Sequence, residues 1–82
     1  MKTEDLDELT SLLRRRLEVI GDAVMRESDP EGQLGRLREV SERINAFHQN
    51  HRSEIPPRLN HFLENVSLQK ALEWAEAERA RR

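Results

Sequence analysis

The segment from Leu59 to Ala75 carries the same apolar spacing twice, and this repeat restricts the fold more than any other feature of the chain. The first set is Leu59, Phe62, Leu63 and Val66, and the second, nine residues later, is Leu68, Ala71, Leu72 and Ala75. At about 100° per residue, one continuous helix would turn these two sets to nearly opposite faces. Either the helix breaks near Asn65 and Ser67, or one helix is packed on two sides.

Local signals at this boundary favour the break. Asn65 tolerates the left-handed conformation that ends many helices, and Ser67 is a good N-cap for a following helix. Pro57 fits the first turn of the helix that precedes the break. We therefore predict separate helices at 57–64 and 68–80, and we expect Ser67→Ala to cost about 1 kcal/mol as a lost cap.

A longer apolar stripe precedes this region and predicts a helix over about 4–26, with Thr3 as its N-cap. The stripe consists of Leu6, Leu9, Leu13, Leu17, Ile20 and Val24, with Leu12 and Val19 on its flank. Gly21 lies inside the pattern, where glycine costs about 1 kcal/mol relative to alanine. We attribute Gly21 to close packing against a neighbouring helix rather than to a hinge.

A second long stripe predicts a helix over about 30–51, capped by Ser28 or Asp29 and with Pro30 in its first turn. The stripe consists of Leu37, Val40, Ile44 and Phe47, with Leu34 adjacent. A short polar connection between two long helices favours an antiparallel arrangement. We predict one all-α domain over 1–82: a long antiparallel helical hairpin plus a shorter, broken C-terminal helical segment, forming a small helical bundle.

Composition indicates how such a chain gains stability. Only 35% of the 82 residues are hydrophobic and none is cysteine, so a small core has no disulfide or thiolate metal site to supplement it. Self-association is the remaining supplement. The acidic, non-apolar N-terminal segment and the short apolar runs lead us to expect a soluble cytoplasmic protein without signal peptide or membrane span.

The candidate chemical sites are weak. His48, His51 and His61 are the only set with zinc ligand chemistry, but no carboxylate pairing accompanies them, so we expect no metal and no cofactor. Three consecutive arginines, Arg14 to Arg16, fan through about 200° of a helix and cannot all face one phosphate backbone. We therefore expect no nucleic-acid binding, although a nucleic-acid-associated regulator stays an alternative.

A family resemblance adds a second alternative. The segment from Leu12 to Ile20, followed by Asp29-Pro30-Glu31, resembles the first helix and first loop of the all-helical chorismate mutases. The resemblance implies a substrate-binding role for Arg16 and places Asp29 at the start of the second helix. The chain departs from that family at Gly32-Gln33, at Thr3, and in having no lysine between Lys2 and Lys70. It therefore points to a degenerate relative without the enzymatic activity.

These observations favour a small non-catalytic protein–protein interaction module that self-associates. Its expected partner is a second copy or another protein, and no catalytic residue or small-molecule substrate is evident. Because the short third helix covers less than half of the hairpin, we expect an uncovered apolar surface near the N-terminal end. The predicted interface residues are Leu6, Leu9, Leu12, Val19 and Trp74.

Overall fold

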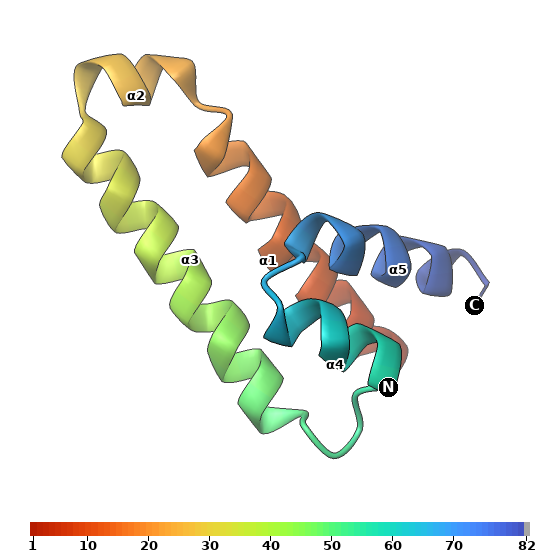
Figure 1. Cartoon of the computed structure of the whole chain (residues 1–82). Helices are drawn as coiled ribbons and strands as arrows, with labels where there is room; N and C mark the ends of the chain where they lie inside the picture. The colour runs from red at the N-terminus through yellow and green to blue at the C-terminus, as the bar shows by residue number, and fades with distance from the viewer. Residues whose placement is uncertain (82) are drawn as a thin grey trace.

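The computed structural model describes residues 1–81, which form five helices packed on one another (Figure 1). The helices are α1 (Thr3–Ile20), α2 (Ala23–Ser28), α3 (Pro30–Asn50), α4 (Pro57–Glu64) and α5 (Leu68–Ala80). No strand occurs within residues 1–81, so the all-α prediction is confirmed. None of these helices combines the length and the apolar composition that crossing a bilayer requires.

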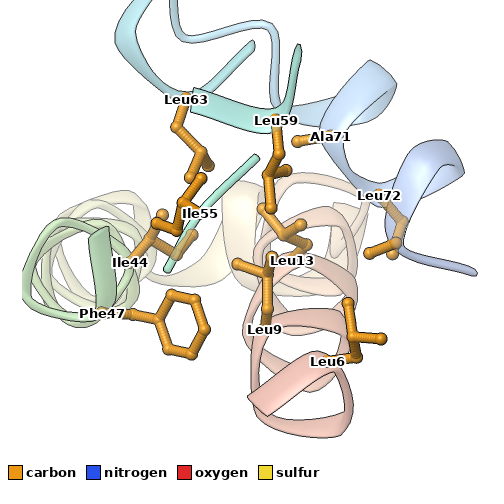
Figure 2. Packing of buried hydrophobic residues seen from close by; sticks show 11 residues of the cluster. Leu6, Leu9, Leu13, Ile44, Phe47, Ile55, Leu59, Leu63, Ala71 and Leu72 are labelled. Carbon is orange, nitrogen blue, oxygen red and sulfur yellow. The ribbon is translucent and has the colours of Figure 1, made fainter. Parts of the chain in front are cut away.

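The two long helices, α1 and α3, run antiparallel as predicted, and α2 lies across one end of the hairpin (Figure 1). Their predicted stripes supply much of the core. Leu9 and Leu13 of α1 are buried together with Ile44 and Phe47 of α3 (Figure 2). The hairpin therefore follows from the sequence periodicity of about 3.6 residues.

The predicted continuous helix over 4–26 is wrong, because the helix ends at Ile20 and a separate short helix follows. Asp22 explains the break: its carboxylate accepts a hydrogen bond from the Met25 N–H at 3.0 Å and so caps a new helix. Close packing does not explain Gly21 either, since a Cβ there would meet only backbone oxygens of its own helix. The first helix also begins at Thr3, one residue before its predicted start.

The predicted break between 64 and 68 is confirmed, and α4 and α5 have the predicted bounds. The left-handed residue is Val66, with φ of 54°, rather than Asn65. The Ser67 N–H donates to the Phe62 oxygen at 2.8 Å and the Val66 N–H to the Leu63 oxygen at 3.3 Å, which is a Schellman ending. The Ser67 side chain makes no cap hydrogen bond, so the expected cost of Ser67→Ala loses its basis.

The short helices cover the end of the hairpin that holds the N-terminal half of α1. Figure 2 shows Leu59 and Leu63 of α4 directed toward the hairpin, with Ile55 of the preceding connection near Ile44. Helix α5 lies against α1, and its Ala71 and Ala75 are completely buried. Two small side chains on one face let two helices approach closely, so α5 seals this end of the core.

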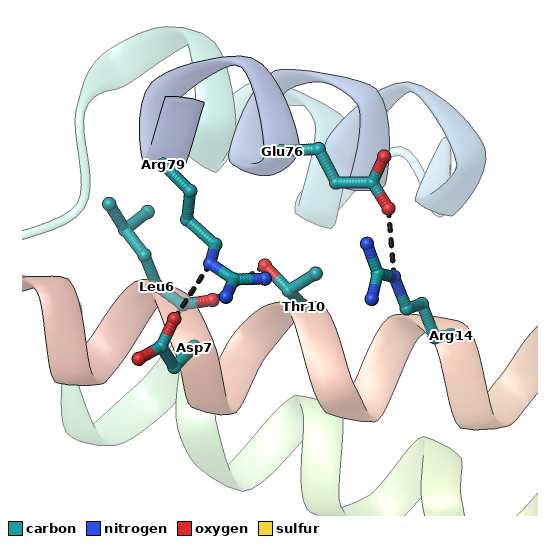
Figure 3. A network of polar contacts seen from close by, with 6 residues as sticks. All are labelled: Leu6, Asp7, Thr10, Arg14, Glu76 and Arg79. Atoms are coloured by element: carbon teal, nitrogen blue, oxygen red, sulfur yellow. Dashed lines mark hydrogen bonds and ion pairs between the residues drawn. The ribbon is translucent and has the colours of Figure 1, made fainter. Parts of the chain in front are cut away.

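Charged residues flank the α1/α5 contact on both sides (Figure 3). Arg79 Nε lies 2.7 Å from Asp7 Oδ1, and Arg14 Nε lies 2.9 Å from Glu76 Oε1. Between these pairs, the buried Thr10 hydroxyl donates to the Leu6 oxygen of its own helix at 2.6 Å. This bond satisfies the one buried polar side chain of the described residues, so α5 can pack on it without a desolvation penalty.

Candidate functional site

The end of the hairpin that carries α2 is not covered, because α4 and α5 both lie beside the opposite end (Figure 1). Large apolar side chains from α1, α2 and α3 are exposed there. They are Leu17, Ile20, Val24 and Leu34, with exposed fractions of 39%, 37%, 77% and 58%. We call these four residues the free-end surface. Exposed apolar groups gathered at one end of a small protein are typical of a binding surface.

A hollow of about 200 Å³ lies between α1 and α3 at this end. Its lining consists of Val19, Ile20, Arg26, Pro30, Gln33, Leu34 and Leu37. The Gln33 side-chain N–H donates to the Val19 oxygen at 2.8 Å, and the Arg26 guanidinium donates to the Ile20 oxygen. These bonds use the polar groups of the lining internally, so the hollow presents mainly apolar surface.

Two aspartates cap the helices at this end of the molecule. Asp22 caps α2, and the Asp29 carboxylate accepts a hydrogen bond from the Gly32 N–H at 3.0 Å to cap α3. The Ser28 hydroxyl donates to the Val24 oxygen at 2.7 Å and closes the last turn of α2. Because each helix start is capped, the chain reverses within a few residues and brings the last turn of α1 beside the first turns of α3.

Charge is divided along the hairpin. Residues 18–31, which we call the tip, carry five acidic side chains and one basic, a net charge of −4. Residues 14–17 together with 36–43, which we call the middle, carry six basic side chains and two acidic, a net charge of +4. The net charges of the tip and the middle are therefore equal and opposite. The free-end surface overlaps both segments, because Ile20 and Val24 belong to the tip and Leu17 belongs to the middle.

The structure places two of the predicted interface residues in the core. Leu6 and Leu9 are both 0% exposed, so the expectation that they are left partly uncovered is wrong. The physical reason is that α5 packs along α1, and its Ala71, Leu72 and Ala75 are buried in the same core cluster as Leu6 and Leu9. The uncovered end of the hairpin is the opposite one.

The other three predicted interface residues are half-buried. Leu12 and Trp74 pack against the edge of the core cluster, which leaves little of either side chain for a partner. Val19 lines the hollow at the free end. It is thus the one predicted interface residue that the structure places at the uncovered end.

The three histidines do not converge in the described part of the chain. His48 Nε2 lies 2.7 Å from Asn60 Oδ1, His51 Nε2 lies 3.3 Å from Asp5 Oδ1, and His61 Nδ1 lies 3.2 Å from Asn65 Nδ2. Within residues 1–81, the one group with metal-ligand spacing is Asp5, Glu8 and His51, whose ligand atoms lie within 4.8 Å of one another. The Asp5–His51 contact already gives this group a structural role.

The three consecutive arginines have different environments. Arg14 pairs with Glu76, Arg15 is exposed, and Arg16 is half-buried in a pocket between the hairpin and the α4–α5 turn. Of the two residues singled out by the family resemblance, Arg16 therefore lines a pocket and Asp29 caps α3. No protein-family model, curated protein or solved structure matches the chain.

Sequence reasoning missed the free-end surface because it assigned all four of its residues to buried stripes or their edges. A signal was present in the connection between α3 and α4, which spans only residues 51–56. So short a connection returns the chain at the end of the hairpin where α3 finishes and α1 begins. The short helices must then cover that end and leave the α2 end free.

Proposed function

We propose that this chain is a non-catalytic protein–protein interaction module that pairs with a second copy of itself through the free-end surface. The uncovered end of the hairpin carries the proposal, because four apolar side chains and an apolar hollow lie there without a covering helix. The cytoplasmic location expected from the sequence is part of the same proposal.

The charge division supports a second copy as the partner. If two hairpins overlap at their free ends and point in opposite directions, the −4 tip of each lies over the +4 middle of the other. A two-fold axis repeats this favourable contact twice, as an isologous interface requires. Four hairpin helices, α1 and α3 from each copy, would then surround one shared apolar layer.

The surface area also supports pairing. The chain exposes 5686 Å², whereas a compact monomer of 9.7 kDa exposes about 5,100 Å² by the scaling of area with mass. The excess of about 600 Å² is near the share that each partner contributes to a small specific interface. The elongated shape, 40 × 24 × 20 Å, is the source of this excess.

The first experiment measures the mass in solution. Size exclusion with light scattering at micromolar concentration should give about twice the chain mass of 9.7 kDa. Leu34→Asp places a charge in the free-end surface and should give a monomer, whereas Ala77→Asp, at an exposed position of α5 away from this surface, should still give a dimer. A monomeric parent protein, or a dimer that Leu34→Asp leaves intact, would contradict the proposal.

The second experiment tests the orientation of the pair. One variant, E27R/E31R, reverses charges in the tip, and the other, R36E/R38E, reverses charges in the middle; all four side chains are exposed. Each double substitution brings the net charge of its segment to 0, so a homodimer of either variant loses both tip-to-middle attractions and should dissociate to monomers. In an equimolar mixture one −4 tip can still lie over one +4 middle, so a heterodimer should form. Two variants that both remain homodimers would show that the tip does not face the middle.

The nucleic-acid alternative rests on the same basic middle. The acidic tip beside it would repel a phosphate backbone, which is why we place this alternative second. A salt-dependent mobility shift of mixed-sequence DNA or RNA by the parent protein, lost in R36E/R38E, would favour nucleic acid over self-association.

A further inference from the structure

Three side chains with metal-ligand chemistry lie together where α3 ends beside the first turns of α1. Asp5 and Glu8 are three residues apart on α1, so they share one face of that helix. His51 follows the last turn of α3, and one ligand atom from each of the three lies within 4.8 Å of the others. The expectation of no metal considered only the three histidines, and His48 and His61 take no part in this set.

The imidazole of His51 is held with one nitrogen directed at these carboxylates. Its Nδ1 lies 3.0 Å from the Phe47 carbonyl oxygen, which can only accept, so Nδ1 carries the hydrogen of that bond. The ring also stacks on the Phe47 side chain, with centroids 4.1 Å apart. A histidine that binds a metal almost always donates its other ring N–H to a carbonyl or carboxylate in this way. A contact outside the three side chains therefore fixes the tautomer that leaves a lone pair on Nε2.

The contact between His51 and Asp5 requires a cation. In the neutral ring, the Nε2 lone pair faces Asp5 Oδ1 at 3.3 Å, so two acceptors oppose each other. Either a proton on Nε2 or a metal ion bound to both atoms makes this contact favourable. A proton balances one negative charge, whereas Asp5 and Glu8 carry two. A divalent ion balances both and keeps the imidazole neutral.

The distance between these two atoms fits zinc. Bonds of about 2.0–2.1 Å at tetrahedral angles place two ligand atoms about 3.3–3.4 Å apart. His51 Nε2 and Asp5 Oδ1 already have this separation, and both side chains are half-buried, which limits their movement. Glu8 is exposed, so its side chain can rotate to complete the third ligand position. The exposed side also gives the ion a path of entry.

We propose that Asp5, Glu8 and His51 bind one Zn²⁺ ion, with water as the fourth ligand. Zinc accepts imidazole nitrogen together with carboxylate oxygen, whereas magnesium and calcium prefer oxygen ligands alone. The ion joins the start of α1 to the end of α3 and so stabilises the covered end of the hairpin. This inference does not depend on self-association, because all three residues lie outside the tip and the middle.

The test is a titration of the full chain with ZnCl₂, followed by amide chemical shifts and thermal unfolding. Saturable shifts at one Zn²⁺ per chain are expected in residues 4–9 and 47–52 and not in residues 61–65. A free Zn²⁺ concentration about 100 times the dissociation constant should raise the melting temperature by about 10 °C. Mg²⁺ at the same concentration should do neither. Leu34→Asp should bind Zn²⁺ as the parent protein does, whether or not it changes the oligomeric state.

Two pairs of variants separate this site from general binding by surface side chains. Glu8→Gln should weaken Zn²⁺ binding at least about tenfold, because the loss of an outer-shell partner alone costs that much. Glu4→Gln, at another exposed glutamate of the same helix, should leave the affinity unchanged. Because both glutamates are exposed, neither change should disturb the fold.

The histidine pair tests the nitrogen ligand. His51→Gln should also weaken Zn²⁺ binding at least about tenfold, whereas His61→Gln, at an exposed histidine, should not. Equal affinities of the two glutamate variants, a loss of binding in His61→Gln, or no saturable Zn²⁺ binding by the parent protein would overturn the proposal.

Discussion

His51 Nε2 lies 3.3 Å from Asp5 Oδ1, and this contact joins the end of α3 to the first turn of α1. The other ring nitrogen, Nδ1, lies 3.0 Å from the Phe47 oxygen, and the ring stacks on the Phe47 side chain with centroids 4.1 Å apart. One half-buried histidine therefore closes the covered end of the hairpin through two polar contacts and one aromatic contact.

Removing this ring should destabilise the fold. His51→Ala loses the contact with the Asp5 carboxylate, the hydrogen bond at the Phe47 oxygen and the stacking on Phe47, so we expect the free energy of unfolding to fall by about 1–2 kcal/mol. Urea unfolding at fixed protein concentration measures the change. His61→Ala is the matched control, because its ring is exposed and touches only its own helix end, and it should cost less than about 0.5 kcal/mol. Similar losses from the two variants would contradict this account.

Val66 and Val24 are both highly exposed valines, and replacing each by glycine should change stability in opposite directions. The left-handed conformation of Val66 costs about 1–2 kcal/mol, and Val66→Gly removes this cost. Glycine also makes the unfolded chain more flexible, which lowers the free energy of unfolding by about 0.4–1 kcal/mol. We expect a net gain of about 0.5–1 kcal/mol. Val24→Gly, within α2, should instead lose a few tenths. Thermal unfolding would refute the strain at Val66 if both variants melted below the parent.

Two helical glycines should also respond differently to alanine. A Cβ at Gly32 would overlap the Asp29 carboxylate that caps α3, whereas a Cβ at Gly35 would meet nothing within 4 Å. Gly35→Ala should therefore gain about 0.5–1 kcal/mol from helix propensity. Gly32→Ala should gain little or nothing, because displacing the cap costs about 1 kcal/mol. Chemical unfolding of both variants at one concentration compares them, and an equal gain would show that the cap tolerates the methyl group.

Asp29 and Ser67 were both predicted as helix caps, and they differ in their hydrogen bonds. Asp29 accepts from the Gly32 N–H, so Asp29→Ala should lower the free energy of unfolding by about 1 kcal/mol. Ser67 makes no such bond, so Ser67→Ala should cost less than half as much. The Schellman hydrogen bonds of the α4–α5 turn use backbone groups and survive this substitution. A larger loss at Ser67 than at Asp29 would reverse the assignment.

The sequence predicted those elements whose signals are local. Pro57 fixed the start of α4, and the two opposed stripes fixed the break before Leu68, so both short helices have their predicted bounds. The break at Gly21 was missed because the apolar stripe continues in register through Val24, and the prediction rested on this periodicity without the Asp22 cap. Register alone does not show whether the backbone between two apolar positions is helical.

The candidate site was harder to predict than the fold, because it depends on which parts of a stripe are covered. Leu6 and Leu17 belong to the same stripe, yet one is fully buried and the other is 39% exposed. The difference arises from the position of α5, which contacts α1 over residues distant in sequence. Residues from four helices or their connections likewise line the pocket at Arg16, and the spacing of residues along a single helix cannot predict such a group.

Close approach of α5 to α1 is the feature that decides which end of the hairpin is covered, and it can be tested at one alanine. Ala75 is 0% exposed, so Ala75→Leu forces extra methylene groups into a filled contact and should cost about 1–3 kcal/mol. Ala77→Leu, two residues later on the exposed side of the same helix, should change stability by less than about 0.5 kcal/mol. Both changes keep helix propensity similar, so the difference between them measures packing against α1.

The same pair of variants has a second readout in the mobility of α5. Moving α5 outward would also lengthen the Arg14–Glu76 and Arg79–Asp7 contacts that flank it (Figure 3), so hydrogen exchange in α5 should accelerate in Ala75→Leu and not in Ala77→Leu. If Ala75→Leu matched the parent in stability and in exchange, α5 would not be packed closely on α1. Leu6 and Leu9 would then be candidates for an exposed surface once more.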